Sequence, residues 1–179
     1  MSKRTLTITL QPDWKAALRQ AGRRASARSY QGEVLNFESP GVFFGRMTEW
    51  SAALADTPTI LTGDFNIAPD DRDVHDPAAW QGQVLVSEPE RAAFQALIDD
   101  GFVDVVRPHA PGPGVYTYWD YRQLRFPKRQ GMRIDFILGS PGLARRVVHA
   151  EIVKDERRPG KKGDPSPSDH APVLVDLRR

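Results

Sequence analysis

The chain has 179 residues, which is enough for one domain with its own hydrophobic core. It contains no cysteine, so disulfides and thiolate metal sites are excluded and a metal would need oxygen or imidazole ligands. The formal net charge of +2 is too small to predict nucleic-acid binding by itself.

Residues 1–49 predict one strand and one basic helix. Thr alternates with Leu or Ile over 5–10, the pattern of a strand with one buried face, and residues 12–29 indicate a helix. The apolar stretch at the start is too short and too polar for a secretory signal. No apolar run approaches the roughly 20 residues of a membrane span. We therefore expect a cytoplasmic protein without a membrane partner.

Helices and strands follow one another in the rest of the chain. Apolar residues recur at helical spacing over 43–54, and a strand is predicted over 58–64. Ser87 and Glu90 form the capping box of a helix that Gly101 ends. Further strands are predicted over 103–107, 116–119, 132–138, 147–153 and 172–177. This order predicts an α/β or α+β fold rather than a helix bundle.

Asp64 and Asn66 stand where the apolar strand 58–64 ends. Side chains at i and i+2 lie on the same face of a strand, so both groups could point into one cleft. The alternative is a local turn, because Asp and Asn bond to nearby backbone amides and Pro69 follows them. The two residues taken alone favour the turn.

Two further polar intrusions occur near the C-terminus. Asp135 lies within the predicted strand 132–138, and a buried carboxylate needs a partner. That partner is either Arg133, in a structural ion pair, or a histidine. Asp169 and His170 precede the last strand; a histidine held by a carboxylate suits acid–base or electrostatic catalysis, and a capping loop is the alternative.

Five segments together resemble the consecutive motifs of a known family. "LTGDFNIAP", "GFVDVVRP", "YTYWDYR", "GMRIDFIL" and "PSDHAPVLVDL" are similar in order and spacing to those of the exonuclease III family of abasic-site endonucleases. That family lies within the endonuclease/exonuclease/phosphatase superfamily. The resemblance covers residues 50–177 and implies a metal-dependent DNA phosphodiesterase of DNA repair, acting as an abasic-site endonuclease or 3′–5′ exonuclease. It also implies a partial α/β sandwich of this type that lacks much of the N-terminal half.

The resemblance implies a role for each polar residue. Asp64 would orient or deprotonate the attacking water, and Asn66 would hold the scissile phosphate. Asp135 would pair with His170, which would stabilise the charge developing on phosphorus. Asp169 would lie beside the metal, with Asp64 as the second expected ligand, and the metal would be Mg²⁺ or Mn²⁺. An in-line displacement needs such an aligned nucleophile and positive charge on the phosphoryl oxygens.

The stretch 116–133 mixes aromatic and basic residues and supports a DNA partner, namely an abasic or 3′-damaged duplex. Aromatic side chains can wedge into a base step or line an abasic pocket, and cations can hold phosphates. The structural alternative is that half of these aromatic residues, Tyr116 among them, belong to the core. The expected DNA-binding residues are Tyr118, Trp119, Tyr121, Arg122, Arg125, Lys128, Arg129 and Arg133.

Residues 1–49 depart from the family pattern. The Asn-rich motif, the Gln-Glu pair with the principal metal-ligand Glu and the Asn-Gly-Tyr segment are not found before Asp64, and Glu33 and Glu38 lie in no matching context. This segment instead resembles the start of small helix-turn-helix regulators. We therefore expect an atypical N-terminal segment, a strand plus a basic helix, over 1–49. The C-terminal part of an exonuclease III-like domain would follow over 50–179.

Two rival functions follow from this departure and from the superfamily. One is a catalytically inactive DNA-binding remnant or fusion protein. The other is the same fold acting on a lipid or inositol phosphodiester, against which the aromatic and basic stretch argues. Half of a two-sheet sandwich would also leave an apolar sheet face uncovered, so an oligomer formed through that face is a further expectation.

Overall fold

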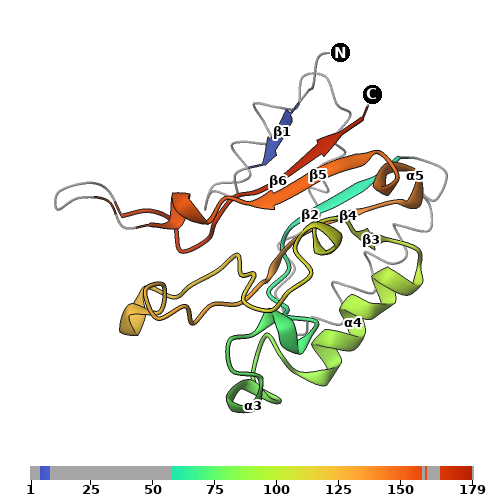
Figure 1. Ribbon diagram of the computed structural model, residues 1–179. Coiled ribbons are helices and arrows are strands. Elements are labelled where there is room, and N and C mark those ends of the chain that lie inside the picture. Colours follow the sequence, from blue (N-terminus) through green and yellow to red (C-terminus); the bar gives the residue numbers. More distant parts are fainter. Residues whose placement is uncertain (1–4, 9–57, 159, 161–165, 179) are drawn as a thin grey trace, which may run out of the picture.

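The computed structural model describes residues 5–8, 58–158, 160 and 166–178 (Figure 1). The helices predicted over 12–29 and 43–54 lie outside these residues. None of the helices in the described part is long and apolar enough to cross a membrane. The described elements are β1 (Thr5–Ile8), β2 (Ile60–Asp64), η1 (Asp71–Asp73), α3 (Pro77–Trp80), α4 (Glu88–Asp99), β3 (Val103–Asp104), η2 (Arg107–His109), η3 (Arg122–Leu124), β4 (Asp135–Gly139), α5 (Pro141–Ala144), β5 (Val147–Ile152), η4 (Lys154–Arg157) and β6 (Val173–Leu177).

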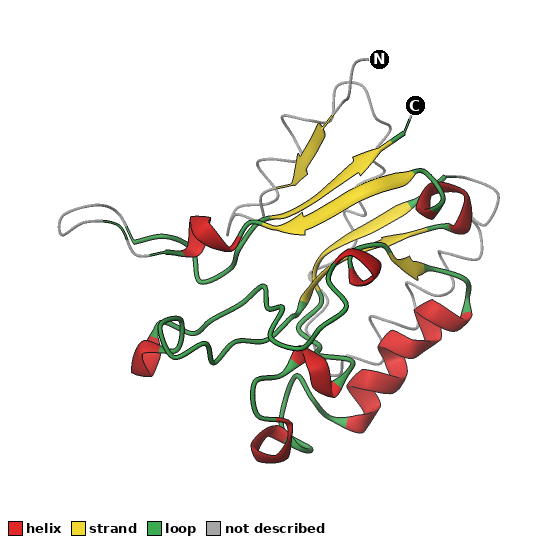
Figure 2. Cartoon of the chain, in the orientation of Figure 1, coloured by secondary structure: helices red, strands yellow, loops and turns green. Residues whose placement is uncertain are grey.

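Two antiparallel sheets and one long helix form the layers of the fold (Figures 1 and 2). One sheet has the order β1-β6-β5 and the other β2-β4-β3. Phe136 and Leu138 of β4 pack in one cluster with α4, while Ile137 packs with β5 and β6. Because β4 is covered on both faces, all of its residues are buried. The predicted partial α/β sandwich is confirmed.

Helix α4 follows its sequence signals closely. The Ser87 amide and hydroxyl donate to Glu90 Oε2 at 3.0 and 2.6 Å, which confirms the capping box. Gly101 has φ +98°, the left-handed region that favours glycine after a helix end. The buried Phe94 ring lies 4.7 Å from the ring of Phe136, so the apolar face of α4 covers the β2-β4-β3 sheet.

Three predicted strands are shorter than expected or absent. β3 ends at Asp104, because Asp104 Oδ1 accepts the amides of Val106 and Arg107 at 3.0 and 3.1 Å and turns the chain into η2. Residues 116–119 form no strand; they make only the isolated bridges of Tyr118 to residues 132 and 170. The strand predicted over 132–138 begins only at Asp135.

The N-terminal strand joins the same fold. β1 pairs with β6 in an antiparallel register that runs from Thr5 opposite Asp176 to Ile8 opposite Val173. This confirms the predicted strand over residues 5–8. The division into an N-terminal segment and a domain starting at residue 50 stays a prediction.

Candidate active site

The first site residue, Asp64, lies at the end of β2 in a tight turn. Its Oδ1 accepts the Asn66 amide at 2.8 Å, and Asn66 has φ 51°, a left-handed conformation that Asn tolerates. The predicted turn is therefore present. The expectation that Asp64 and Asn66 share one strand face is wrong, because the strand ends before Asn66. Asp64 Oδ2 remains available and lies 3.9 Å from His170 Nε2.

Asp135 and His170 form a close pair beside Asp64. The register of β2 and β4 places Asp64 opposite Asp135. His170 Nδ1 lies 2.8 Å from Asp135 Oδ2, and Asp135 is only 2% exposed. A carboxylate only accepts hydrogen bonds, so Nδ1 donates and Nε2 faces Asp64. Of the two partners considered for Asp135, the structure has the histidine.

The charges of this site shift its pKa values. Burial raises the pKa of Asp64 above its ordinary value, and the negative charge of Asp135 raises it further, against the opposing effects of the Asn66 amide and His170. Burial alone would lower the pKa of His170, but the hydrogen bond and negative charge of Asp135 outweigh it, so this pKa is raised. His170 is therefore biased towards the imidazolium.

One ligand atom from each of Asp64, Asp135 and His170 lies within 4.8 Å of the other two. Asp135 Oδ1 is buried and has no hydrogen-bond partner in the described part of the chain. Oxygen atoms of this kind are the ligands that hard divalent cations prefer, so the donor set fits Mg²⁺ or Mn²⁺. The expected ligand Asp64 belongs to this group. Glu33 and Glu38 lie outside the described residues.

Asp169 lies near the group without being part of it. Its negative charge raises the pKa of both Asp64 and His170, although it is a minor cause in each case. Its backbone carbonyl accepts the Trp119 amide at 2.9 Å. Asp169 thus lies beside His170 in the chain, the three convergent ligand atoms come from other residues, and its role as a metal ligand stays a prediction.

The expected DNA-binding residues divide into surface and core. Tyr118 is half-buried, and its ring lies 4.9 Å from the ring of His170. Tyr121 is 53% exposed and leads into a basic segment. Within that segment Arg125 is half-buried near the Trp80 ring, and the exposed cations are Arg122, Lys128 and Arg129. The segment is joined to the site through Tyr118, which lines the same cavity as Arg125.

Two of the expected DNA-binding residues are corrected by their burial. Trp119 is 0% exposed and packs against Tyr116 and Phe126, so its ring belongs to the core. Arg133 is 3% exposed, and its guanidinium is engaged by two aspartates. Neither side chain presents a surface to DNA. The expectation that Tyr116 is a core residue is confirmed, since it is 8% exposed.

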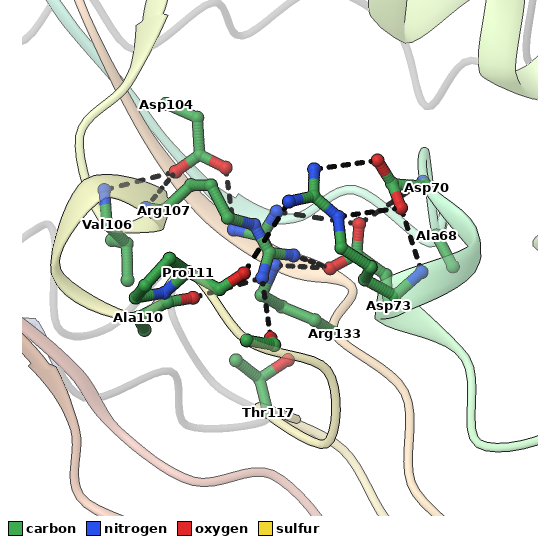
Figure 3. Close-up of polar contacts among 12 residues, drawn as sticks. Ala68, Asp70, Asp73, Asp104, Val106, Arg107, Ala110, Pro111, Thr117 and Arg133 are labelled. Carbon is green, nitrogen blue, oxygen red and sulfur yellow. Dashed lines mark hydrogen bonds and ion pairs between the residues drawn. The ribbon is translucent and has the colours of Figure 1, made fainter.

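The sequence analysis missed a buried ion cluster behind the site, drawn in Figure 3. This Asp73 cluster consists of Asp73, Asp104, Arg107 and Arg133. Arg133 Nε lies 2.6 Å from Asp73 Oδ1, Arg133 Nη1 lies 2.6 Å from Asp104 Oδ2, and Arg107 also pairs with Asp73. Asp73 itself is fully buried. The cluster joins the loop after β2 to β3 and to the residues preceding Asp135.

A cavity of about 90 Å³ opens next to Tyr118. His75, Trp80, Asp120 and Arg125 also line it, so it combines aromatic rings with one cation and one carboxylate. Burial lowers the pKa of His75, so this imidazole is neutral near pH 7. His75 lies among several aspartates in the sequence, a pattern typical of a solvated loop. Its hydrogen bond to the Gly131 carbonyl, at 3.2 Å, instead holds that loop against the segment before β4.

Comparison with known sequences identifies relatives of this chain. Residues 11–170 match the endonuclease/exonuclease/phosphatase family. Exodeoxyribonuclease III of Haemophilus influenzae is 35% identical over 128 residues, which cover 68% of this chain and 46% of the relative. An exodeoxyribonuclease of Bacillus subtilis is 34% identical over 117 residues, which cover 65% of this chain and 43% of the relative. The chain thus spans about half the length of the curated relatives it matches.

Solved structures show the same fold. The 3′ phosphatase NExo from Neisseria, solved with a product DNA hairpin, aligns with a TM-score of 0.71 at 33% identity. That alignment covers 80% of this chain and 56% of NExo. An AP endonuclease from Archaeoglobus fulgidus aligns with a TM-score of 0.66 at 29% identity, covering 78% of this chain and 53% of the other.

Proposed function

Since this chain belongs to the endonuclease/exonuclease/phosphatase family, we propose that it is a metal-dependent DNA phosphodiesterase of DNA repair. The substrate would be an abasic or 3′-damaged duplex, cut as by an abasic-site endonuclease or a 3′–5′ exonuclease. The observation that carries the proposal is the convergence of Asp64, Asp135 and His170 on one point. These are a carboxylate for water activation and an imidazole held by a second carboxylate.

The roles follow from the geometry of the three groups. Asp64, whose pKa is raised by burial, is suited to take the proton of an attacking water. His170, held towards the imidazolium by Asp135, places positive charge where the phosphoryl oxygens become more negative. Asp135 fixes the imidazole through the 2.8 Å contact to Nδ1. Asn66 follows Asp64 in the turn and would contact the scissile phosphate.

We assign Mg²⁺ or Mn²⁺ to Asp64 and, from the family resemblance, to Asp169, and the buried, unpaired Oδ1 of Asp135 is the further oxygen that the geometry offers. The Asp135 oxygen that faces His170 is already engaged, whereas Asp64 Oδ2 lies 3.9 Å from the nearest histidine nitrogen. When bound, the cation supplies positive charge that polarises the phosphoryl oxygen and lowers the pKa of water. The nearby carboxylates would otherwise repel a phosphate, so a cation also makes the site compatible with an anionic substrate.

The exposed basic segment and the cavity beside Tyr118 support DNA as the substrate. Exposed cations of this segment can neutralise backbone phosphates. The cavity, with Trp80 and Tyr118 in its wall, is placed to take an unpaired or damaged nucleotide next to His170. The combination of aromatic and basic residues argues against a lipid or inositol phosphodiester.

Cleavage of a duplex with one abasic site, over a titration of Mg²⁺ and Mn²⁺, tests the proposed activity. Asp64→Ala and His170→Ala should each lower the rate by about 10²–10⁴-fold, because each removes a group acting in proton transfer or charge stabilisation. His149→Ala is the matched control, since that histidine is 54% exposed and pairs with Glu151 instead. Absence of cleavage with either metal, or activity that survives both site substitutions, would refute the proposal.

The salt dependence of DNA binding separates the enzyme from an inactive DNA-binding remnant. Arg122→Gln and Lys128→Gln should each reduce the slope of log K against log salt by about 1, because each removes one phosphate contact. Arg145→Gln is the control, as this exposed arginine follows α5 at the other end of β4. Binding without cleavage would favour the remnant, and slopes that do not change would exclude the basic segment as the DNA contact.

A further inference from the structure

Thr117 is a buried residue with an unusual hydrogen-bond role. Its side chain is 0% exposed, and its hydroxyl oxygen accepts the amides of Ile134 and Asp135, each at 3.1 Å. In a regular strand two consecutive amides point to opposite sides, each towards a carbonyl of a different neighbour, whereas here both bond to one hydroxyl. A hydroxyl oxygen has two lone pairs, so the two amides use its full accepting capacity. This side chain therefore replaces the strand partner at the point where β4 begins.

The backbone of Thr117 is bonded to the segment that carries His170. Its carbonyl accepts the Ala171 amide at 2.7 Å, and its amide donates to the Met132 carbonyl at 2.9 Å. On the next residue, Tyr118 bridges to His170. Thr117 thus contacts Asp135 through its side chain and the neighbour of His170 through its main chain. Asp135 and His170 are 35 positions apart in sequence, and this single residue joins their two segments.

We propose that Thr117 is a positioning residue that sets the separation of Asp135 and His170. The two amide bonds fix the backbone at Asp135, and the carbonyl bond fixes the backbone beside His170. Together they hold the 2.8 Å contact between the carboxylate and Nδ1. Because Thr117 is 0% exposed, its side chain presents no surface to a substrate. Its effect on catalysis rests on the function proposed above, whereas its effect on the Asp135–His170 contact does not.

Two substitutions of Thr117 separate the effect of its hydroxyl group from the effect of its side-chain volume. Thr117→Val keeps the branched shape and removes the acceptor, which leaves two buried amides unpaired. Thr117→Ser keeps the acceptor and removes only a methyl group. Leu97→Ala, in the α4 core away from the site, serves as a control for general loss of stability.

The primary measurement is the proton NMR signal of His170 Nδ1–H at a temperature where every variant is folded. We expect the downfield signal of wild type to persist in Thr117→Ser and Leu97→Ala and to shift upfield or disappear in Thr117→Val. In the cleavage assay, Thr117→Val should lower kcat by about 10–100-fold with KM unchanged, as for other groups that orient a catalytic side chain. Thr117→Ser should retain most of the activity.

The NMR and cleavage results test the positioning role of Thr117 separately from the proposed nuclease function. A Thr117→Val protein with the wild-type Nδ1 signal would overturn the positioning role even if wild type cleaves DNA. The same holds if Thr117→Ser loses the signal as fully as Thr117→Val. If wild type cleaves no DNA, the proposed function fails, but the NMR comparison still decides whether Thr117 holds the Asp135–His170 contact.

Discussion

Replacing Asp73 with Asn tests whether the Asp73 cluster stabilises the fold. The carboxylate of Asp73 is fully buried between the guanidinium groups of Arg107 and Arg133. Asn keeps the shape and one acceptor oxygen and removes the negative charge. Two buried or half-buried cations are then left facing each other with less compensation, which is the situation that makes breaking a buried ion pair costly.

The size of the effect can be worked from the contacts. Removing one partner of a buried ion pair costs about 3–5 kcal/mol. We expect Asp73→Asn to lower the free energy of unfolding by about 3 kcal/mol, at the low end of this range. Asp104 still neutralises Arg133 at 2.6 Å, and the Arg107 side chain is 16% exposed and can be hydrated. With an m-value of about 2 kcal/mol/M, the urea midpoint should fall by about 1.5 M.

Urea denaturation followed by far-UV circular dichroism measures this loss. Asp155→Asn is the matched control: its 2.8 Å pair with Arg158 is similar in length, but the two side chains are 75% and 69% exposed. This exposed pair should contribute less than about 1 kcal/mol. If Asp73→Asn fails to fold, Arg107→Gln tests the same cluster, and its free energy of unfolding should be lower by about 1.5–3 kcal/mol. Losses below about 1 kcal/mol in Asp73→Asn, equal to the control, would refute the reasoning.

Two further predictions concern packing and protonation. A Cβ on Gly131 would lie 2.5 Å from the buried Trp119 Nε1, so Gly131→Ala should lower the free energy of unfolding by about 1–3 kcal/mol. Gly112→Ala is the control and should leave the free energy of unfolding unchanged, because its Cβ meets no atom within 4 Å. Equal urea midpoints for the two variants would contradict this prediction. The pKa of His170 is raised in the folded state, so its contribution to stability is full below the unfolded pKa of about 6.5 and is lost as the pH rises through the folded pKa. Urea unfolding in EDTA should therefore show wild type losing stability relative to His170→Gln across this window, and a difference that grows with pH would be the opposite of the expectation.

The sequence predicts well those elements whose signals are local. Helix α4 carries its own capping box and stop within 87–101, and both are found in the structure. Residues 116–119 look like a strand, but Tyr118 pairs with residue 132 on one side and residue 170 on the other. Those partners lie far along the chain, so no local pattern could show that the pairing stops after single bridges.

The structure brings together three of the predicted site residues, Asp64, Asp135 and His170, but the sequence did not predict the burial of their surroundings. Asp64, Asp135 and His170 were indicated by the resemblance of their motifs to those of a known family, since each residue alone also fits a turn, an ion pair or a capping loop. Asp73, in contrast, lies in an acidic loop that looks solvated, and its partners Arg107 and Arg133 are 34 and 60 positions away. Charge in a sequence indicates exposure only when no distant partner neutralises it, and that information is absent from the local pattern.

The turn at Asp64 is compatible with the catalytic role that we propose for its carboxylate. The Asn66 amide binds Oδ1 at 2.8 Å and ends β2, while Oδ2 is left to face His170. A carboxylate bonded through one oxygen has fewer accessible rotamers, so the turn also orients the second oxygen towards the imidazole. The amide bond opposes the rise in the pKa of Asp64, but burial and the charge of Asp135 outweigh it. The same turn that ends the strand therefore leaves the carboxylate proposed as the base oriented and still able to accept a proton.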